Sequence, residues 1–103
     1  MSSFKIINPY SQKVLETFSY ESLKEVESTL FELHQGFSEW KHAKTNKKQT
    51  LCELIAQALN DNLDEFATMI STDMGKPITE ARAEIKKSIE CCNYYKDNVE
   101  TIN

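Results

Sequence analysis

The chain has 103 residues, 40% of them hydrophobic, which suffices for one small globular domain and excludes a large two-domain enzyme. Its net charge of −4 argues against general nucleic-acid binding, and no apolar run approaches the roughly 20 residues that span a membrane. Three cysteines without metal-type spacing, and an N-terminus without a signal-peptide apolar region, predict reduced thiols and a cytoplasmic protein.

Two apolar, β-branched runs near the start of the chain predict an antiparallel β-hairpin over residues 4–18. Residues 8–13 between them carry turn chemistry, because Asn8 precedes Pro9 and is pushed out of the helical region. A lone hairpin is marginally stable in water, so we expect this one to lie on another element.

Four helices are predicted over residues 22–103, joined at about residues 41–45, 60–62 and 75–77. The first begins with a capping box of Ser22 and Glu25. Its apolar residues follow at three-four spacing: Val26, Leu30, Leu33, Phe37 and Trp40. Thr45 is the predicted N-cap of the second helix. The predicted apolar positions of that helix are Leu51, Leu54, Ile55, Ala58 and Leu59.

The third and fourth helices meet at Gly75 and Pro77. Asn62, with Glu65 three residues later, is predicted to cap the third helix, and Gly75 suits the left-handed position that ends it. Pro77 then opens the long fourth helix. Its predicted apolar stripe is Ile78, Ala81, Ile85, Ile89, Cys92, Tyr95 or Tyr94, and Val99. The fold is therefore mainly α with a short N-terminal β-hairpin.

The side chains capable of chemistry do not form an active site in the sequence. Cys91 and Cys92 are predicted to be buried helical thiols, and Cys52 has no cationic partner at fixed spacing. Neither His34 nor His42 has a metal-ligand partner three or four residues on. We therefore predict no catalytic and no cofactor-binding residue within this chain.

A small basic cluster surrounds the joint between the first two helices: Lys41, Lys44, Lys47 and Lys48. We interpret it as solvated surface, with docking of an anion or a partner as the alternative. Lys47 and Lys48 oppose the helix dipole, so we expect a compensating contact.

The chain resembles the extreme N-terminal portion of the aldehyde dehydrogenase superfamily. Residues 7–9, followed by 14–15, resemble the opening hairpin of that family, and residues 37–40 resemble the end of its first helix. Two departures stand out. Gln12 occupies a turn position where the family commonly has Gly, so the turn must close in another way, and Lys47 and Lys48 stand where an Arg is usual.

The most specific similarity lies at the joint of residues 73–77, read Asp-Met-Gly-Lys-Pro. Glu80-Ala81, Glu84-Ile85 and the aromatic pair Tyr94-Tyr95 follow it as they do in the family. The Met-Gly-Lys-Pro form resembles the succinate-semialdehyde dehydrogenase branch.

The resemblance covers nearly all residues and implies one partial domain, 1–103, the N-terminal portion of the cofactor domain of an α/β aldehyde dehydrogenase-like fold. It implies NAD or NADP as cofactor of the complete enzyme, an aldehyde such as succinate semialdehyde as substrate, the remaining polypeptide as partner, and a homo-oligomer. The catalytic cysteine, general base and phosphate-contacting segments of the family lie beyond position 103. We therefore expect this chain alone to be inactive and to bind no cofactor.

The resemblance also implies a monovalent-cation site formed by the backbone carbonyls of Ile6 and Ile7 and the carboxylate of Glu84. Such oxygen ligands suit a hard cation. Glu84 borders the apolar stripe between Ala81 and Ile85, where a carboxylate needs a partner or a route to water. A simple surface salt bridge of Glu84 is the alternative.

A second hypothesis is a free-standing helical interaction module without enzymatic activity, folded as a closed four-helix bundle with a polar exterior. The two hypotheses differ in the apolar surface that they leave exposed. A scaffold segment awaiting the rest of an enzyme exposes an apolar patch, whereas a closed bundle does not.

Overall fold

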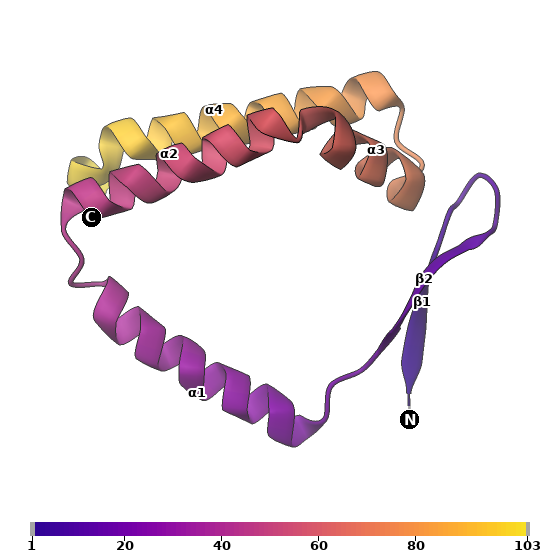
Figure 1. The fold of residues 1–103 in the computed structure, drawn as a ribbon, viewed down its shortest axis with the longest axis horizontal. Helices are drawn as coiled ribbons and strands as arrows, with labels where there is room; N and C mark the ends of the chain where they lie inside the picture. The colour runs from indigo at the N-terminus through magenta and orange to yellow at the C-terminus, as the bar shows by residue number, and fades with distance from the viewer. Residues whose placement is uncertain (1, 103) are drawn as a thin grey trace.

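The computed structural model describes residues 2–102 and shows a β-hairpin followed by four helices (Figure 1). The strands are β1 (Ser3–Ile7) and β2 (Val14–Ser19). The helices are α1 (Leu23–Trp40), α2 (Thr45–Asp61), α3 (Leu63–Met74) and α4 (Ile78–Ile102). The predicted mainly α fold with an N-terminal hairpin is confirmed. Residues 1 and 103 of the predicted range lie outside the described residues.

The hairpin pairs β1 with β2 in antiparallel register, with Phe4 opposite Phe18, and the register shifts between Ile6 and Ile7. Its turn closes without the glycine that the family commonly has at position 12. Gln12 adopts the left-handed conformation with φ of 64°, and its side-chain Nε2 donates a hydrogen bond of 2.9 Å to the Pro9 carbonyl. A side-chain hydrogen bond thus helps to hold a conformation that favours glycine.

The hairpin touches the helices at its turn, where Pro9 lies against Gly75 of the α3–α4 joint. Its strands are otherwise open: all residues of β2, and all of β1 except Ile6, are exposed. Phe4 stacks on Phe18 with 5.5 Å between ring centroids. The expected support from another element is therefore present at the turn.

Helix α1 is held by local interactions. The predicted capping box is present: Glu25 N–H donates to Ser22 Oγ at 3.2 Å, and Ser22 N–H donates to Glu25 Oε2 at 3.3 Å. Every residue of α1 is exposed to solvent, including Leu33 at 63% and Phe37 at 58%. The apolar stripe of α1 is thus present but largely uncovered within the described residues.

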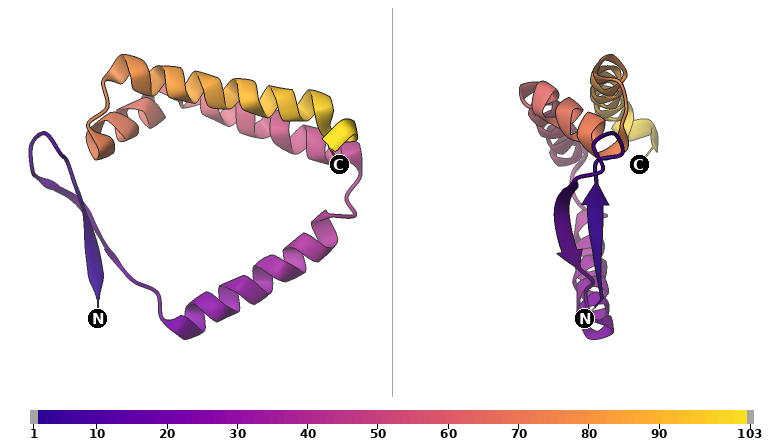
Figure 2. Two further views of the ribbon diagram at one scale, coloured as in Figure 1. Left: turned by 180° about the vertical axis from the view of Figure 1, so that it is seen from behind. Right: turned by 90° about the vertical axis from the view of Figure 1, so that its right-hand side faces the viewer.

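Helices α2 and α4 lie side by side and run antiparallel (Figures 1 and 2). Gln49 Nε2 donates a hydrogen bond of 3.2 Å to the Lys96 carbonyl and fixes their register. On each of the two helices, a set of buried or half-buried positions repeats at three-four spacing, and these two sets are here called the seam. On α2 they are Gln49, Cys52, Ala56 and Leu59; on α4 they are Ala81, Ile85, Ile89, Cys92, Lys96 and Val99.

The seam corrects two predictions about these helices. Leu51, Leu54 and Ile55 were predicted to line α2, but they are 42–57% exposed, because the smaller Cys52–Ala56 face packs on α4. On α4, Lys96 takes the seam position predicted for Tyr94 or Tyr95, both of which are exposed. Helix α2 therefore has a second, larger apolar face that is free.

Two predicted caps are also corrected. Lys44, not Thr45, is the N-cap of α2, and its side chain makes no capping hydrogen bond. Asn62 occupies the N-cap position of α3, but its Nδ2 donates to the Ala58 carbonyl at 2.8 Å and so closes α2. The Asn62 side chain makes no capping hydrogen bond to the first turn of α3.

The core of the described residues is small. Helix α3 packs on α4 through Ala67 and Ala81, both 0% exposed, and Asp64 pairs with Arg82 at 3.0 Å between Oδ1 and Nε. The radius of gyration is 17.8 Å, against about 13 Å for a compact domain of this length. The ribbon forms an open frame, so the closed four-helix bundle is not what the chain adopts (Figure 1).

Candidate functional site

The α3–α4 joint is the most precisely built local structure in the chain. Gly75 ends α3 in the left-handed conformation with φ of 73°, and its N–H donates to the Ser71 carbonyl at 2.9 Å. Ser71 Oγ then donates to the Lys76 carbonyl at 2.7 Å. The Pro77 carbonyl accepts the N–H of Ala81 at 3.0 Å and so starts α4. These bonds fix the direction in which Lys76 leaves the joint.

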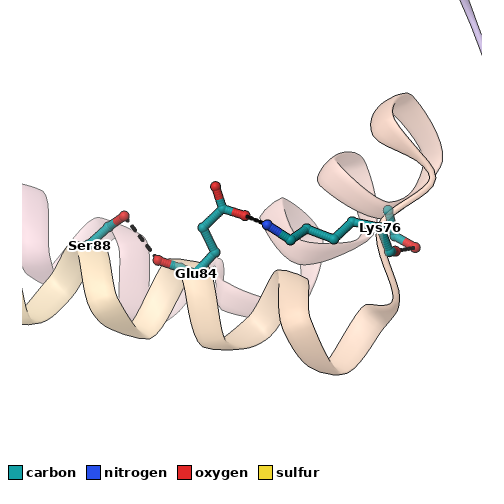
Figure 3. Close-up of polar contacts among 4 residues, drawn as sticks. Lys76, Glu84 and Ser88 are labelled. Carbon is teal, nitrogen blue, oxygen red and sulfur yellow. Dashed lines mark hydrogen bonds and ion pairs between the residues drawn. The ribbon is translucent and has the colours of Figure 1, made fainter.

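Lys76 and Glu84 form an ion pair across this joint (Figure 3). Lys76 Nζ lies 2.8 Å from Glu84 Oε2, and the two side chains are 39% and 50% exposed. The hydrogen bond that Lys76 donates to Glu84, followed by the negative charge of Glu84, raises the pKa of Lys76 above the ordinary 10.5. Glu80 adds a smaller effect in the same direction. The surface salt bridge, which was the alternative for Glu84, is the arrangement that the structure contains.

The three residues of the predicted cation site lie on separate elements. Ile6 and Ile7 belong to β1, and Glu84 belongs to α4; these two elements lie apart in the ribbon (Figure 1). Glu84 Oε2 is engaged by Lys76, while its other carboxylate oxygen points away from the ammonium (Figure 3). The structure thus brings Glu84 to Lys76 rather than to the hairpin, and the cation site stays a prediction.

A hollow of about 480 Å³ lies beside the joint and is lined by Ile70, Met74, Lys76, Pro77, Glu80 and Glu84. Its polar groups are one ammonium and two carboxylates. The raised pKa of Lys76 favours the ammonium form over the nucleophilic neutral amine. Within residues 2–102, no group of three His, Cys, Asp or Glu side chains is placed to hold a metal ion. Such a hollow can bind a ligand by charge and apolar contact.

Sequence reasoning missed Lys76 as the partner of Glu84. The two residues are eight positions apart and on either side of a helix joint, so no helical spacing rule relates them. The sequence signal for this pair was the Gly75–Pro77 joint itself. A sharp joint between two helices places the residue inside it, Lys76, near the first turns of α4.

The cysteines lie in surroundings that do not activate their thiols as nucleophiles. Cys92 is half-buried, and burial raises the pKa of its thiol above the ordinary 9.0, with smaller contributions from Cys91 and Cys52. Cys91 is exposed, which corrects the prediction that both thiols are buried. Neighbouring helical residues point about 100° apart, so Cys91 leaves the seam that Cys92 occupies. Neither arrangement gives an activated nucleophile.

A second hollow, of about 330 Å³, lies where α1 meets α2 and is lined by Trp40, Lys47, Thr50, Leu51 and Leu54. Lys47 Nζ lies 5.9 Å from the centroid of the Trp40 ring, within the range of a cation–π contact. This is the compensating contact that Lys47 was expected to need at the positive end of α2. The hollow continues the free apolar face of α2 toward the end of α1.

Within the part of the chain that the structure describes, no helix combines the length and apolar character needed to cross a membrane.

The fold and the joint define an aldehyde dehydrogenase segment, and the chain belongs to the aldehyde dehydrogenase family, whose model matches residues 1–103. It is 32% identical over 92 residues to the succinate semialdehyde dehydrogenase (NAD(P)+) of Escherichia coli (strain K12), covering 89% of this chain and 20% of that protein. It is 27% identical over 89 residues to the malonate-semialdehyde dehydrogenase of Bacillus pumilus, covering 86% of this chain and 18% of that protein.

Solved structures show the same likeness. The glyceraldehyde-3-phosphate dehydrogenase GapN of Methanocaldococcus jannaschii, complexed with NADP, matches with a TM-score of 0.88 at 26% identity and covers 93% of this chain and 21% of that chain. A betaine aldehyde dehydrogenase of Staphylococcus aureus, in complex with NAD+, shares the fold with a TM-score of 0.87. The chain spans about one fifth of the length of these relatives.

Proposed function

We propose that this chain is the N-terminal scaffold segment of an NAD(P)-dependent aldehyde dehydrogenase that oxidises a short aldehyde such as succinate semialdehyde to the acid. The observation that carries the proposal is the exposed apolar stripe of α1, together with membership of the family. The names of the relatives, several of them succinate-semialdehyde dehydrogenases, support the substrate. The chain itself performs no chemistry.

The α1 apolar face is the surface that this proposal assigns to the rest of the enzyme. It consists of Val26, Leu30, Leu33, Phe37 and Trp40, which are 37–63% exposed. The free face of α2 adds Leu51, Leu54 and Ile55. So many large apolar side chains at helical spacing are favourable only if another body of protein removes them from water.

In this proposal the described residues have a structural role, and the chemistry belongs to the rest of the complete enzyme. In the complete enzyme, the nicotinamide cofactor accepts the hydride. The described residues offer no activated thiol and no glycine-rich phosphate loop, so they hold and orient elements rather than react. The α3–α4 joint fixes the angle between two helices, and the seam makes α2 and α4 one stiff unit on which the remaining polypeptide can pack. A cytoplasmic location and a homo-oligomeric complete enzyme complete the proposal.

The proposal is tested by a hybrid enzyme. The matching residues of the Escherichia coli relative are replaced by this chain, and NAD(P)H formation from succinate semialdehyde is recorded. We expect the hybrid to be active and the chain alone to be inactive with either NAD or NADP. Turnover by the chain alone would overturn the scaffold assignment, and an inactive hybrid that has folded and assembled would overturn the match to this enzyme class.

A pair of α1 variants makes the test specific. Replacing Leu30, Leu33 and Phe37 by Ser removes the α1 apolar face and should abolish or sharply reduce hybrid activity. The matched control replaces Glu32 and Gln35 by Ser, on the opposite side of the same exposed helix, and should leave activity unchanged. Full activity of the first variant would show that α1 packs on nothing in the assembled enzyme.

A further inference from the structure

The seam between α2 and α4 places two cysteines in the same layer. Gln49 on α2 bonds to Lys96 on α4, which sets the antiparallel register. Three residues further along α2 lies Cys52, and four residues back along α4 lies Cys92. Because facing positions in an antiparallel pair step in opposite directions by three or four residues, Cys52 and Cys92 oppose each other.

The burial pattern supports this pairing. Cys52 and Cys92 are both half-buried, whereas Cys91, one residue away, is exposed. The next position on the α2 side of the seam is Ala56, 8% exposed, and so small a side chain lets the two helix axes approach closely. The pKa of Cys92 is raised mainly by burial and also by the charges of Cys91 and Cys52, so Cys52 is near enough to act on it.

We propose that Cys52 and Cys92 are a thiol pair that closes reversibly to a disulfide and locks α2 to α4. A disulfide needs two Cα atoms within roughly 4.4–6.8 Å and side chains that point toward each other. In this proposal, the opposed seam positions beside an alanine layer satisfy that requirement. This pair is separate from the scaffold role, because it makes no contact with substrate or cofactor.

The closure is a two-step exchange with a small-molecule disulfide such as oxidised glutathione. The thiolate of one cysteine attacks the glutathione disulfide, forms a mixed disulfide and releases one glutathione thiolate. The thiolate of the other cysteine then attacks the protein-bound sulfur and releases the second glutathione. Two protein thiols lose two electrons, the oxidant gains them, and the two thiol protons pass to the released glutathione thiolates.

The test is peptide mapping of the purified chain after incubation with oxidised glutathione and trapping of the remaining thiols. We expect the Cys52–Cys92 cross-link to dominate, and a reducing agent to reverse it. Denatured chain serves as a reference, because without the seam Cys91 and Cys92 should cross-link to Cys52 in comparable yield. A native chain that shows comparable yields, or no Cys52–Cys92 cross-link, would overturn the proposal.

Three variants sharpen this result. Cys91→Ser is the matched control and should form the cross-link as the parent chain does. Cys52→Ser and Cys92→Ser should each abolish it, with the oxidised chain then showing no rise in its urea midpoint. Loss of the cross-link in Cys91→Ser would show that Cys91, and not Cys92, is the thiol that reacts. That result would refute the seam geometry.

Discussion

Pro9 and Gly75 touch, although they are 66 positions apart in the chain. A Cβ atom placed on Gly75 would lie 2.9 Å from Pro9 Cγ, closer than side chains tolerate. Gly75 also has φ of 73°, where a side chain is strained in any surroundings. Glycine is therefore required at position 75 for two reasons: it ends α3 in the left-handed conformation, and it leaves room for the hairpin turn.

The variant Gly75→Ala should lower the free energy of unfolding by about 1–2 kcal/mol from backbone strain alone, with an added penalty from the Pro9 contact. Urea denaturation followed by helical signal measures this. Combining it with Pro9→Ala should restore part of the loss. If the double variant is no more stable than Gly75→Ala, the hairpin turn does not rest on the joint.

Gly36 provides the control for that substitution. It lies within α1, and nothing stands within 4 Å of a Cβ placed there. Gly36→Ala should therefore stabilise α1 by about 0.5–1 kcal/mol, because alanine gives up less conformational freedom in a helix. A rise in helical content is the readout.

The local features of the fold could be predicted from sequence, and the pairings between elements could not. Ser22 and Glu25 specify a helix start within four residues, and Gly75 with Pro77 specifies a joint within three. The α2 seam was mispredicted because the helix carries two apolar faces, and the face with larger residues is the one left free. Lys76 and Glu84 meet through the geometry of the joint, which no helical spacing describes.

Gln12 tests how the hairpin turn compensates for a missing glycine. Gln12→Gly should relieve the left-handed strain, whereas Gln12→Ala keeps the strain and loses the hydrogen bond to the Pro9 carbonyl. We expect the glycine variant to favour the closed turn by about 1 kcal/mol over the alanine variant. Hairpin populations from NMR chemical shifts give the comparison. Equal populations would mean that residue 12 carries no strain.

Ser22 tests the dependence of α1 on its cap. Because α1 is exposed along its whole length, its helical state rests on local interactions, and Ser22→Ala should weaken it by about 1 kcal/mol. Amide exchange in the first turn should accelerate accordingly. Ser38→Ala is the control, since Ser38 lies near the other end of α1 and donates a hydrogen bond to the His34 carbonyl. A change in Ser22→Ala no larger than in the control would contradict the cap.

Cys92 makes the stability of the chain sensitive to alkaline pH. Burial raises the pKa of this thiol above 9.0, so the folded state disfavours its thiolate relative to the unfolded chain. The stability that the neutral thiol contributes is present below pH 9.0 and is lost as pH rises from there through the raised pKa. Cys92→Ala should remove this part of the alkaline decline.

The difference in exposure between Cys91 and Cys92 should also appear in their rates of alkylation at neutral pH. Cys91, which is exposed, should react with iodoacetamide before half-buried Cys92, and Cys91→Ser should remove the fast phase. Equal rates would show that the seam opens faster than the reagent reacts.

Glu84 separates the ion pair from the predicted cation site. Glu84→Gln should lower the pKa of Lys76 toward 10.5, because the hydrogen bond and charge of Glu84 are what raise it. Exchanging sodium or potassium for a bulky organic cation at constant ionic strength should leave the carboxyl signal of Glu84 unchanged if Lys76 is its partner. A shift specific to the small cations, seen also at Ile6 and Ile7, would support the cation site instead.

The open frame has a consequence for how this polypeptide matures. The hairpin and α1 carry apolar side chains that the other described elements leave exposed, while α2 and α4 can close on each other once both have left the ribosome. The hairpin and α1 should therefore be the stretch that molecular chaperones hold longest, and the last part of this chain to acquire protection from proteases.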